Sequence, residues 1–311
     1  MITCLIATHN GAAWLPKTLE GYQQLQSPPG GWKLVVIDNA STDDTRSLID
    51  RFTSHLPLTV IAEPRRGKNT ALNTGLTRLE GDLAVFSDDD AIPHHNWLVE
   101  LRKCADAHSE FSIFGGVVLP RWEIPPPDWL LKWVPLQPTF AITNPTWEEG
   151  PINPLHIFGP NMAVRADVFQ SGYRFNTSVG PSAGSYAMGS ETEFTNRLAR
   201  SGFRCWHCKG AVVEHIVRRS QMEKTWVLNR ALRYGRGQYR LTKSELTPKL
   251  LFGFPRYLIR EVIVQWARLQ TLRLTGSEEE QFKARWLLKY LAGQTQEGRQ
   301  FHAEGEGALE D

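Results

Sequence analysis

The sequence predicts an α/β protein with a central, mostly parallel sheet flanked by helices, followed by a helical C-terminal extension. Before residue 80, a short apolar run, a polar turn and a segment of helical spacing follow one another three times. Regular alternation of this kind is typical of parallel strands joined by crossover helices. Beyond residue 217 the apolar residues recur at helical spacing.

The first four predicted strands end in polar segments. The strands are expected at residues 2–7, 33–39, 58–63 and 82–87, with helices at 12–25, 40–52 and 71–79. The polar segments that follow the strands are 8–11, 38–45, 64–70 and 88–90. Because ligands of such sheets bind beyond the carboxyl ends of the strands, these four segments are expected to converge on one site.

The second half of the chain is predicted to be irregular at first and then helical. Residues 119–160 are dense in proline and tryptophan, which favours an irregular insertion over a second domain. The later elements are expected to be a helix at 190–201, a strand at 203–208, and helices at 222–235, 248–274 and 277–293. Ser277 is the expected cap of the last helix, and the glycine- and glutamate-rich residues 296–311 are predicted to be a disordered tail.

Charge is distributed unevenly along the 311 residues, although the net charge is only +2. Residues 1–196 carry 14 Lys and Arg against 21 Asp and Glu, whereas residues 197–300 carry 21 against 8. The basic half indicates either a surface that faces an anionic partner or a solvated helical face. The N-terminus has no charged-then-apolar leader, the four cysteines are scattered, and no apolar run is long enough to span a membrane, so a cytoplasmic protein is expected.

Three consecutive aspartates, 88–90, close the fourth predicted strand. Clustered carboxylates repel one another unless a cation offsets their charge. The triad therefore favours a binding site for Mg²⁺ or Mn²⁺ together with a phosphorylated substrate. Asp88 and Asp90 are the expected working pair, because alternate residues of an extended chain point the same way. Two alternatives remain: a solvated acidic turn, and an aspartyl phosphatase of the haloacid-dehalogenase type, whose motif normally lies on the first strand.

Seven segments, in order, resemble family-2 glycosyltransferases, the inverting enzymes of GT-A fold that use nucleotide-sugar donors. The four on the donor side are "CLIATHNGAAWLPKTLEG", "VVIDNASTDDT", "EPRRGKNTALNTGL" and "VFSDDDAIPHHNWL". The three on the acceptor side are "FGPNMAVRADVF", "GSETEFTNRLARSGFRCWHC" and "AVVEHIV". The resemblance implies a GT-A catalytic domain at 1–217, with a nucleotide-sugar half at about 1–118 and an acceptor half at about 119–217, then a helical extension at 218–295.

The resemblance also implies roles for individual residues. Asp88 and Asp90 match the family's Asp-X-Asp and, with His215, would surround Mn²⁺ or Mg²⁺. Glu191 is the expected catalytic base, with Glu193 as the alternative, because the family's usual Glu-Asp pair is replaced here by Ser190 and Glu191. The residues expected to contact the nucleotide are Thr8, Asn10, Asp38, Lys68, Asn73, Asp88 and Asp89.

The resemblance implies an enzyme that transfers a sugar from a nucleotide-sugar to a hydroxyl of a cell-surface polysaccharide or lipid-linked glycan. The favoured donor is a UDP-sugar. No nucleic-acid partner is expected. The alternative from another class is a non-catalytic binding protein that keeps the fold at a membrane surface. The 248–274 helix has apolar residues at helical spacing and several arginines. It is therefore expected either to lie on the inner face of an anionic membrane or to cover the catalytic domain.

Overall fold

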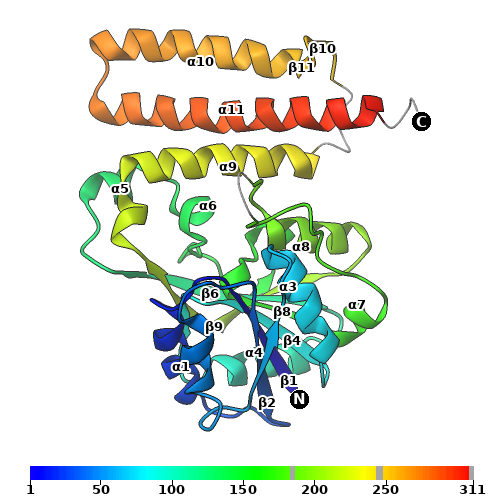
Figure 1. The fold of residues 1–311 in the computed structure, drawn as a ribbon. Helices are drawn as coiled ribbons and strands as arrows, with labels where there is room; N and C mark the ends of the chain where they lie inside the picture. Colours follow the sequence, from blue (N-terminus) through cyan, green and yellow to red (C-terminus); the bar gives the residue numbers. More distant parts are fainter. Residues whose placement is uncertain (183–185, 243–247, 308–311) are drawn as a thin grey trace. The chain divides into compact units, whose positions relative to one another are not determined.

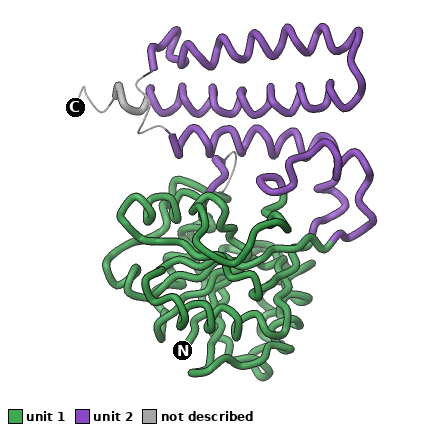
Figure 2. Tube along the Cα trace, turned by 180° about the vertical axis from the view of Figure 1, so that it is seen from behind, with its two compact units in different colours: residues 1–121, 140–183, 190–216 green, residues 122–139, 184–189, 217–311 purple. Residues whose placement is uncertain are grey.

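A computed structural model describes residues 1–182, 186–242 and 248–307, the side chains of 303–307 excepted. The chain divides into two compact units (Figure 2). Unit 1 comprises residues 1–121, 140–183 and 190–216, and unit 2 comprises residues 122–139, 184–189 and 217–311. Part of the proline-rich insertion, which we assigned to the acceptor half of the catalytic domain, therefore belongs to unit 2.

Among the described residues, nine strands of unit 1 form one mixed sheet (Figure 1). Its main path runs in the order β3-β2-β1-β4-β8-β6-β9-β5, and β7 pairs with β9. The first four are parallel, as predicted: β1 (Ile2–Thr8), β2 (Trp32–Asp38), β3 (Leu58–Ala62) and β4 (Leu83–Asp88).

Antiparallel pairing enters the sheet beyond β4. The strands of this half are β5 (Ala91–Pro93), β6 (Ile113–Trp122), β7 (Gly150–Pro151), β8 (Met162–Arg165) and β9 (Cys205–Val217). Strand β8 runs antiparallel to β4 and β6, and β5 runs antiparallel to β9. The sheet is thus parallel among β1 to β4 and mixed as a whole.

Two apolar clusters show how the helices cover the sheet. Alternate residues of β1 belong to different clusters: Cys4 and Ile6 lie in one and Leu5 in the other. The first cluster includes side chains of α1 (Leu15–Gln23), α2 (Thr45–Asp50) and α4 (Trp97–Ala107). The second includes side chains of α3 (Lys68–Gly75), α7 (Ala166–Gln170) and α8 (Ser190–Arg200). Because strand side chains alternate between faces, each cluster is the core of one face.

Unit 2 is built mainly from helices, with a two-stranded hairpin. Its elements include α5 (Asp128–Trp133), α9 (Lys224–Thr242), β10 (Leu250–Leu251), β11 (Phe254–Pro255), α10 (Arg256–Thr275) and α11 (Glu278–Gly307). The short helix α6 (Leu136–Phe140) spans the boundary between the units. Helix α11 lies between α9 and α10 in both views (Figures 1 and 2). No described helix is both long and apolar enough to cross a membrane.

Three local expectations can be compared with these elements. Ser277 caps α11 as predicted: its hydroxyl accepts from the backbone N–H of Glu280 at 3.3 Å and donates to the Glu280 carboxylate at 2.8 Å. The second helix, expected within residues 40–52 with Ser41 or Thr42 as its cap and Asp43 and Asp44 in its first turn, begins only at Thr45. The tail expected to be disordered from residue 296 instead continues α11 to residue 307, and residues 308–311 lie outside the described part.

Candidate active site

The predicted site residues gather where the parallel strands of unit 1 end. Thr8 is the last residue of β1, Asp38 of β2 and Asp88 of β4. Helix α3 begins at Lys68 and the first turn of α8 holds Glu191. Residues separated by up to 183 positions in the chain thus come from one edge of the sheet, because parallel strands align their carboxyl ends.

Lys68 bridges two of the predicted functional carboxylates. Its ammonium group lies 2.6 Å from Oε1 of Glu191 and also forms an ion pair with Oδ1 of Asp88. The three side chains are only 16–22% exposed, so water screens the interaction weakly. The expected donor-side aspartate and the expected base are therefore linked through a single cation.

The pKa values of this cluster reflect burial and mutual charge. Burial alone would lower the pKa of Lys68, but the carboxylates of Asp88 and Glu191 raise it above its ordinary value. Burial raises the pKa of Asp88, the Lys68 ammonium opposes this, and Glu191 and Asp90 raise it further. The edge of the sheet thus concentrates negative charge that one lysine offsets only in part.

Strand pairing brings His215 to the aspartates. Strand β5 follows the triad directly, and its Ala91 pairs with His215 of β9. Nδ1 of His215 lies 2.7 Å from the carbonyl oxygen of Phe140, so this nitrogen carries the donated hydrogen. Nε2 then faces Oδ1 of Asp90 at 3.3 Å. Burial would lower the pKa of His215, but Asp90 raises it above the usual value.

A divalent cation fits the chemistry of these donors. Asp88 and Asp90 supply carboxylate oxygens, and the ring nitrogen of His215 lies beside Asp90. Within residues 1–182, 186–242 and 248–307, no group of three or more His, Cys, Asp and Glu side chains is close enough to hold a metal. Mg²⁺ and Mn²⁺ commonly use only one or two carboxylates and complete their shells with water and phosphate. The structure therefore does not bring the three predicted ligands Asp88, Asp90 and His215 together as one group, although the two carboxylates are the donor type that such a cation prefers.

The loops after β1 and β2 are hydrogen-bonded to each other and to the aspartates. The hydroxyl of Thr8 donates to Oδ2 of Asp89 at 2.5 Å. Asn10, which has a positive φ of 53°, accepts from the backbone N–H of Thr42 at 2.8 Å. Asp38 accepts from the backbone N–H of Ser41 at 3.1 Å. These contacts fix the turns in which Thr8, Asn10 and Asp38 lie.

Two predicted residues have partners elsewhere. The side-chain amide of Asn73 donates to the carbonyl oxygen of Phe175 at 2.8 Å, and its oxygen accepts from the Phe175 backbone N–H at 2.9 Å. Glu193 is paired with Arg197 one turn along α8, with Nε to Oε1 at 2.8 Å. Asn73 thus joins α3 to the segment at 175, and Glu193 stabilises its own helix.

Several residues that position the site were not predicted from the sequence. The side-chain nitrogen of buried Asn39 donates to the carbonyls of Glu63 and Arg65, and its oxygen accepts from Gly67 N–H at 2.7 Å, directly before Lys68. The hydroxyl of Ser190 donates to Oδ1 of Asn69. Asn39 and Asn69 lie within the motif segments "VVIDNASTDDT" and "EPRRGKNTALNTGL", but only the folded loops reveal their hydrogen bonds.

Gly159 makes room for the side chain of Glu191. A Cβ atom at position 159 would lie 2.5 Å from both Cδ and Oε1 of Glu191, closer than real contacts allow. The glycine belongs to the "FGPN" segment, which in the structure forms a short 3-10 turn (Gly159–Asn161). The backbone of this turn therefore packs directly against the expected base.

Comparison with protein families gives one match to this chain. The model of Glycosyl transferase family 2 matches residues 3–171, more than half of the chain. The matched range contains the strands β1 to β4, Lys68 and the three aspartates. It ends before Glu191 and His215.

Curated relatives share shorter stretches. A glycosyltransferase of Haloferax volcanii, AglE, is 29% identical over 99 residues, which are 31% of this chain and 33% of that protein. The poly(ribitol-phosphate) β-N-acetylglucosaminyltransferase TarS of Staphylococcus aureus is 24% identical over 106 residues, 33% of this chain and 18% of TarS. The chain thus spans a third or less of the length of these relatives.

Solved structures resemble the chain over nearly all its length. The mannosyltransferase PcManGT of Pyrobaculum calidifontis, in complex with GDP-Man and Mn²⁺, superposes with a TM-score of 0.62 at 21% identity, covering 96% of this chain and 86% of that one. TarS of S. aureus in complex with UDP-GlcNAc gives 0.54 at 14% identity, covering 99% and 92%. Identities this low establish the fold alone. The superpositions confirm the predicted GT-A architecture with its helical C-terminal region.

Proposed function

The chain belongs to glycosyl transferase family 2, and on that premise we propose that it is an inverting glycosyltransferase. Its donor is a nucleotide-sugar, and a UDP-sugar is the favoured one. The acceptor is a hydroxyl of a cell-surface polysaccharide or of a lipid-linked glycan. The observation that carries the proposal is the bridge from Asp88 through Lys68 to Glu191 at the carboxyl edge of the sheet. It joins the residue expected at the donor diphosphate to the residue expected at the acceptor hydroxyl.

Glu191 acts as the general base in this proposal. The acceptor oxygen attacks the anomeric carbon, its proton passes to the Glu191 carboxylate, and the bond from the anomeric carbon to the diphosphate breaks with its electron pair on the phosphate oxygen. An adjacent ammonium group favours the ionised form of a carboxylate, which is the form a base needs. Glu193 is the weaker candidate, because the bridge through Lys68 to Asp88 reaches Glu191, whereas Glu193 pairs with Arg197 along its own helix.

The donor half holds the nucleotide diphosphate. Thr8, Asn10 and Asp38 line the nucleoside side, Lys68 and Asn73 contact the base or the diphosphate, and Asp89 completes the expected set. Asp88, Asp90 and His215 would hold Mn²⁺ or Mg²⁺, which when bound would offset the negative charge of the leaving group. A Mn²⁺ ion accompanies GDP-Man in the PcManGT structure, and UDP-GlcNAc is bound in that of TarS. These ligands support the proposal of a nucleotide-sugar with a divalent cation.

The place of action follows from the acceptor. We propose that the protein works in the cytoplasm, at the inner face of the cell membrane, where a lipid-linked glycan would be presented. Residues 248–274, predicted to be one helix, instead contain the β10–β11 hairpin followed by α10. This segment is the part that is expected to reach the membrane.

The proposal is tested by measuring nucleotide-sugar turnover with Mn²⁺ or Mg²⁺ in the wild type and three variants. Glu191→Gln should lower kcat by about 10² to 10⁴, the range of a general base. Asp90→Ala should lower it at least as much, and the loss should not be recovered at high donor concentration. Glu193→Gln is the matched control on the same helix turn and should retain most activity.

The results separate the alternatives. Full activity in both Glu191→Gln and Asp90→Ala would refute the assigned roles. Nucleotide binding without sugar release or transfer in the wild type would favour the non-catalytic binding protein, which the replacement of the usual Glu-Asp pair by Ser190 and Glu191 leaves open. Loss of activity in Glu193→Gln alone would move the base to Glu193.

A further inference from the structure

Helix α10 and the hairpin before it carry an unusual share of exposed apolar side chains. Twelve large apolar residues of the described chain are exposed, and seven of them fall between residues 251 and 274: Leu251, Phe252, Tyr257, Ile263, Val264, Trp266 and Leu274. Phe252 and Leu274 are each 88% exposed. Scattered apolar residues are ordinary on protein surfaces, but concentration in a single element marks an interaction surface.

The exposed residues lie on the face of α10 that points away from α11. Leu258 and Leu269 are buried, with Val262 partly buried between them, and this stripe packs against α11. At 100° per residue, Ile263, Val264 and Leu274 fall on the opposite side of the helix. Helix α10 therefore has two apolar stripes, of which α11 covers only one.

The hairpin adds an apolar tip at the N-terminal end of α10. Strands β10 and β11 pair through Leu251 and Phe254, and the turn between them holds Phe252 in the left-handed region, with a φ of 53°. A bulky residue rarely adopts this conformation, and here it coincides with an almost fully exposed ring. The turn geometry thus holds Phe252 out in solvent.

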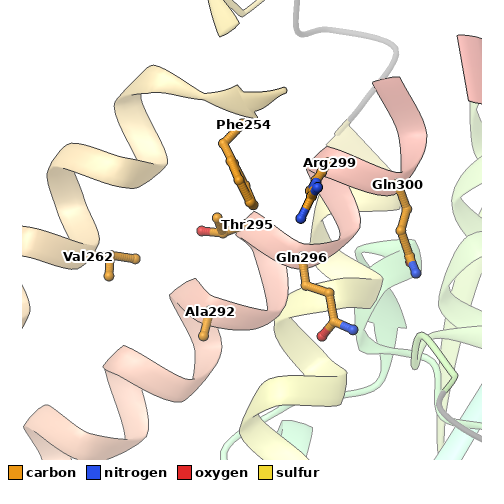
Figure 3. A pocket seen from close by; sticks show the side chains of 7 residues that line it. All are labelled: Phe254, Val262, Ala292, Thr295, Gln296, Arg299 and Gln300. Carbon is orange, nitrogen blue, oxygen red and sulfur yellow. The ribbon is translucent and has the colours of Figure 1, made fainter. Parts of the chain in front are cut away.

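A pocket lies beside the hairpin, on the side of α10 that faces α11. It has a volume of about 550 Å³ and lies between α10 and α11 (Figure 3). Phe254 comes from the hairpin and Val262 from α10, and the remaining lining residues come from α11. The guanidinium of Arg299 stands over the ring of Phe254 at 5.0 Å, which places a positive charge at this pocket.

The charges on α10 and its hairpin are almost all positive, whereas the glutamates 278–280 follow at the start of α11. Between residues 248 and 275 the exposed charged residues are Lys249, Arg256, Arg260, Arg268 and Arg273, against the single acid Glu261. Arg256 and Arg260 lie on the outward face near the hairpin, and Arg268 lies at its edge. An exposed apolar stripe with arginines around it and aromatic residues at its edge is the pattern of a helix lying in a lipid interface.

We infer that α10 and the β10–β11 hairpin form a docking surface for an anionic lipid bilayer, with Phe252, Ile263, Val264 and Leu274 entering the interface and the arginines contacting lipid phosphates. This surface belongs wholly to unit 2. The inference does not depend on the proposed sugar transfer, because vesicle binding and donor cleavage are measured separately.

The test is flotation of the full chain with vesicles of phosphatidylcholine alone or with 30% phosphatidylserine. The wild type should bind the anionic vesicles and release them at high salt, because salt screens the attraction between the arginines and the lipid phosphates. Arg256→Gln combined with Arg260→Gln should weaken this binding by about 30-fold, at roughly 1 kcal/mol for each arginine near the surface. Phe252→Ser combined with Ile263→Ser should abolish it.

Control variants and measurements distinguish a loss of membrane binding from a loss of the fold, a loss of activity and self-association. Leu131→Ser replaces an equally apolar residue, 46% exposed on α5, and should bind vesicles as the wild type does. All variants should keep the wild-type melting temperature and the same donor cleavage in solution. Equal binding to neutral and anionic vesicles, or no binding to either, would overturn the inference. So would a dimer in sedimentation velocity that the Phe252 and Ile263 substitutions dissociate, because a second copy would then be the occupant.

Discussion

Single polar residues decide how the loop between β3 and α3 is held. Glu63 is buried, and its carboxylate accepts from Nε of Arg65 at 3.0 Å, from the Arg65 backbone N–H at 2.9 Å and from the Thr74 hydroxyl at 2.5 Å. Its backbone carbonyl accepts from the side chain of Asn39 at 2.9 Å. The loop ends at Lys68, so these bonds fix the residue that bridges Asp88 and Glu191.

The same bonds predict a pH dependence. The hydrogen bond from Arg65 lowers the pKa of Glu63, burial opposes this, and Thr74 lowers it further, to about 2. A carboxyl group whose pKa is depressed in the folded state stabilises that state above its ordinary pKa, and this contribution is lost as the pH falls from about 4.5 toward 2. Glu63→Gln should therefore lower the free energy of unfolding by about 1–3 kcal/mol at pH 7, and the difference from wild type should shrink in that acid range.

Urea unfolding at several pH values measures this effect. Glu110→Gln changes an exposed glutamate and serves as the control, with little effect at any pH. A Glu63→Gln difference that stays constant from pH 7 to pH 2 would contradict the assignment.

At the scale of elements, two helices of unit 2 approach each other through glycines. A Cβ atom at Gly235 of α9 would lie 1.9 Å from the carbonyl oxygen of Tyr290, and one at Gly293 of α11 would lie 2.0 Å from that of Leu232. Both contacts are with backbone, which cannot rotate away as a side chain can. The pairing of α9 with α11 thus requires residues without side chains at these two positions.

We predict that Gly293→Ala destabilises unit 2 although alanine is the better helix former. The methyl group must separate the helices, at a cost of about 1–3 kcal/mol. Urea unfolding followed by far-UV circular dichroism measures the change, and Gln296→Ala, an exposed position one turn further along α11, is the control. An unchanged or raised stability of Gly293→Ala would mean that the close contact is not maintained in solution.

At the scale of the whole molecule, the proposed chemistry and the proposed membrane surface belong to different compact units. The bridged carboxylates lie in unit 1, and α10 with its hairpin lies in unit 2. The charge asymmetry read from the sequence follows the same division, since the exposed face of α10 is rich in arginine. Donor binding and vesicle binding should therefore respond to separate sets of substitutions.

Ligand binding should stabilise unit 1 selectively. A ligand present at 100 times its Kd adds about 2.7 kcal/mol to the state that binds it. Differential scanning fluorimetry with UDP- and GDP-sugars, with and without Mn²⁺, should show a metal-dependent rise in melting temperature for the correct donor. Asp90→Ala should lose this rise while keeping its melting temperature without ligand within a few degrees. A rise in melting temperature of equal size in Asp90→Ala would contradict the proposed metal site.

The four parallel strands, the aspartates at the end of β4 and the family could be predicted from the sequence, because strand periodicity and motif spacing are local properties. The sequence did not determine the antiparallel half of the sheet, the helical continuation past residue 296 or the partners of Lys68. Those depend on which distant segments pair: Asn39 with Gly67, Ala91 with His215, Gly293 with Leu232. They can be seen only in the folded chain, because a long-range contact leaves no periodicity in the residues that make it.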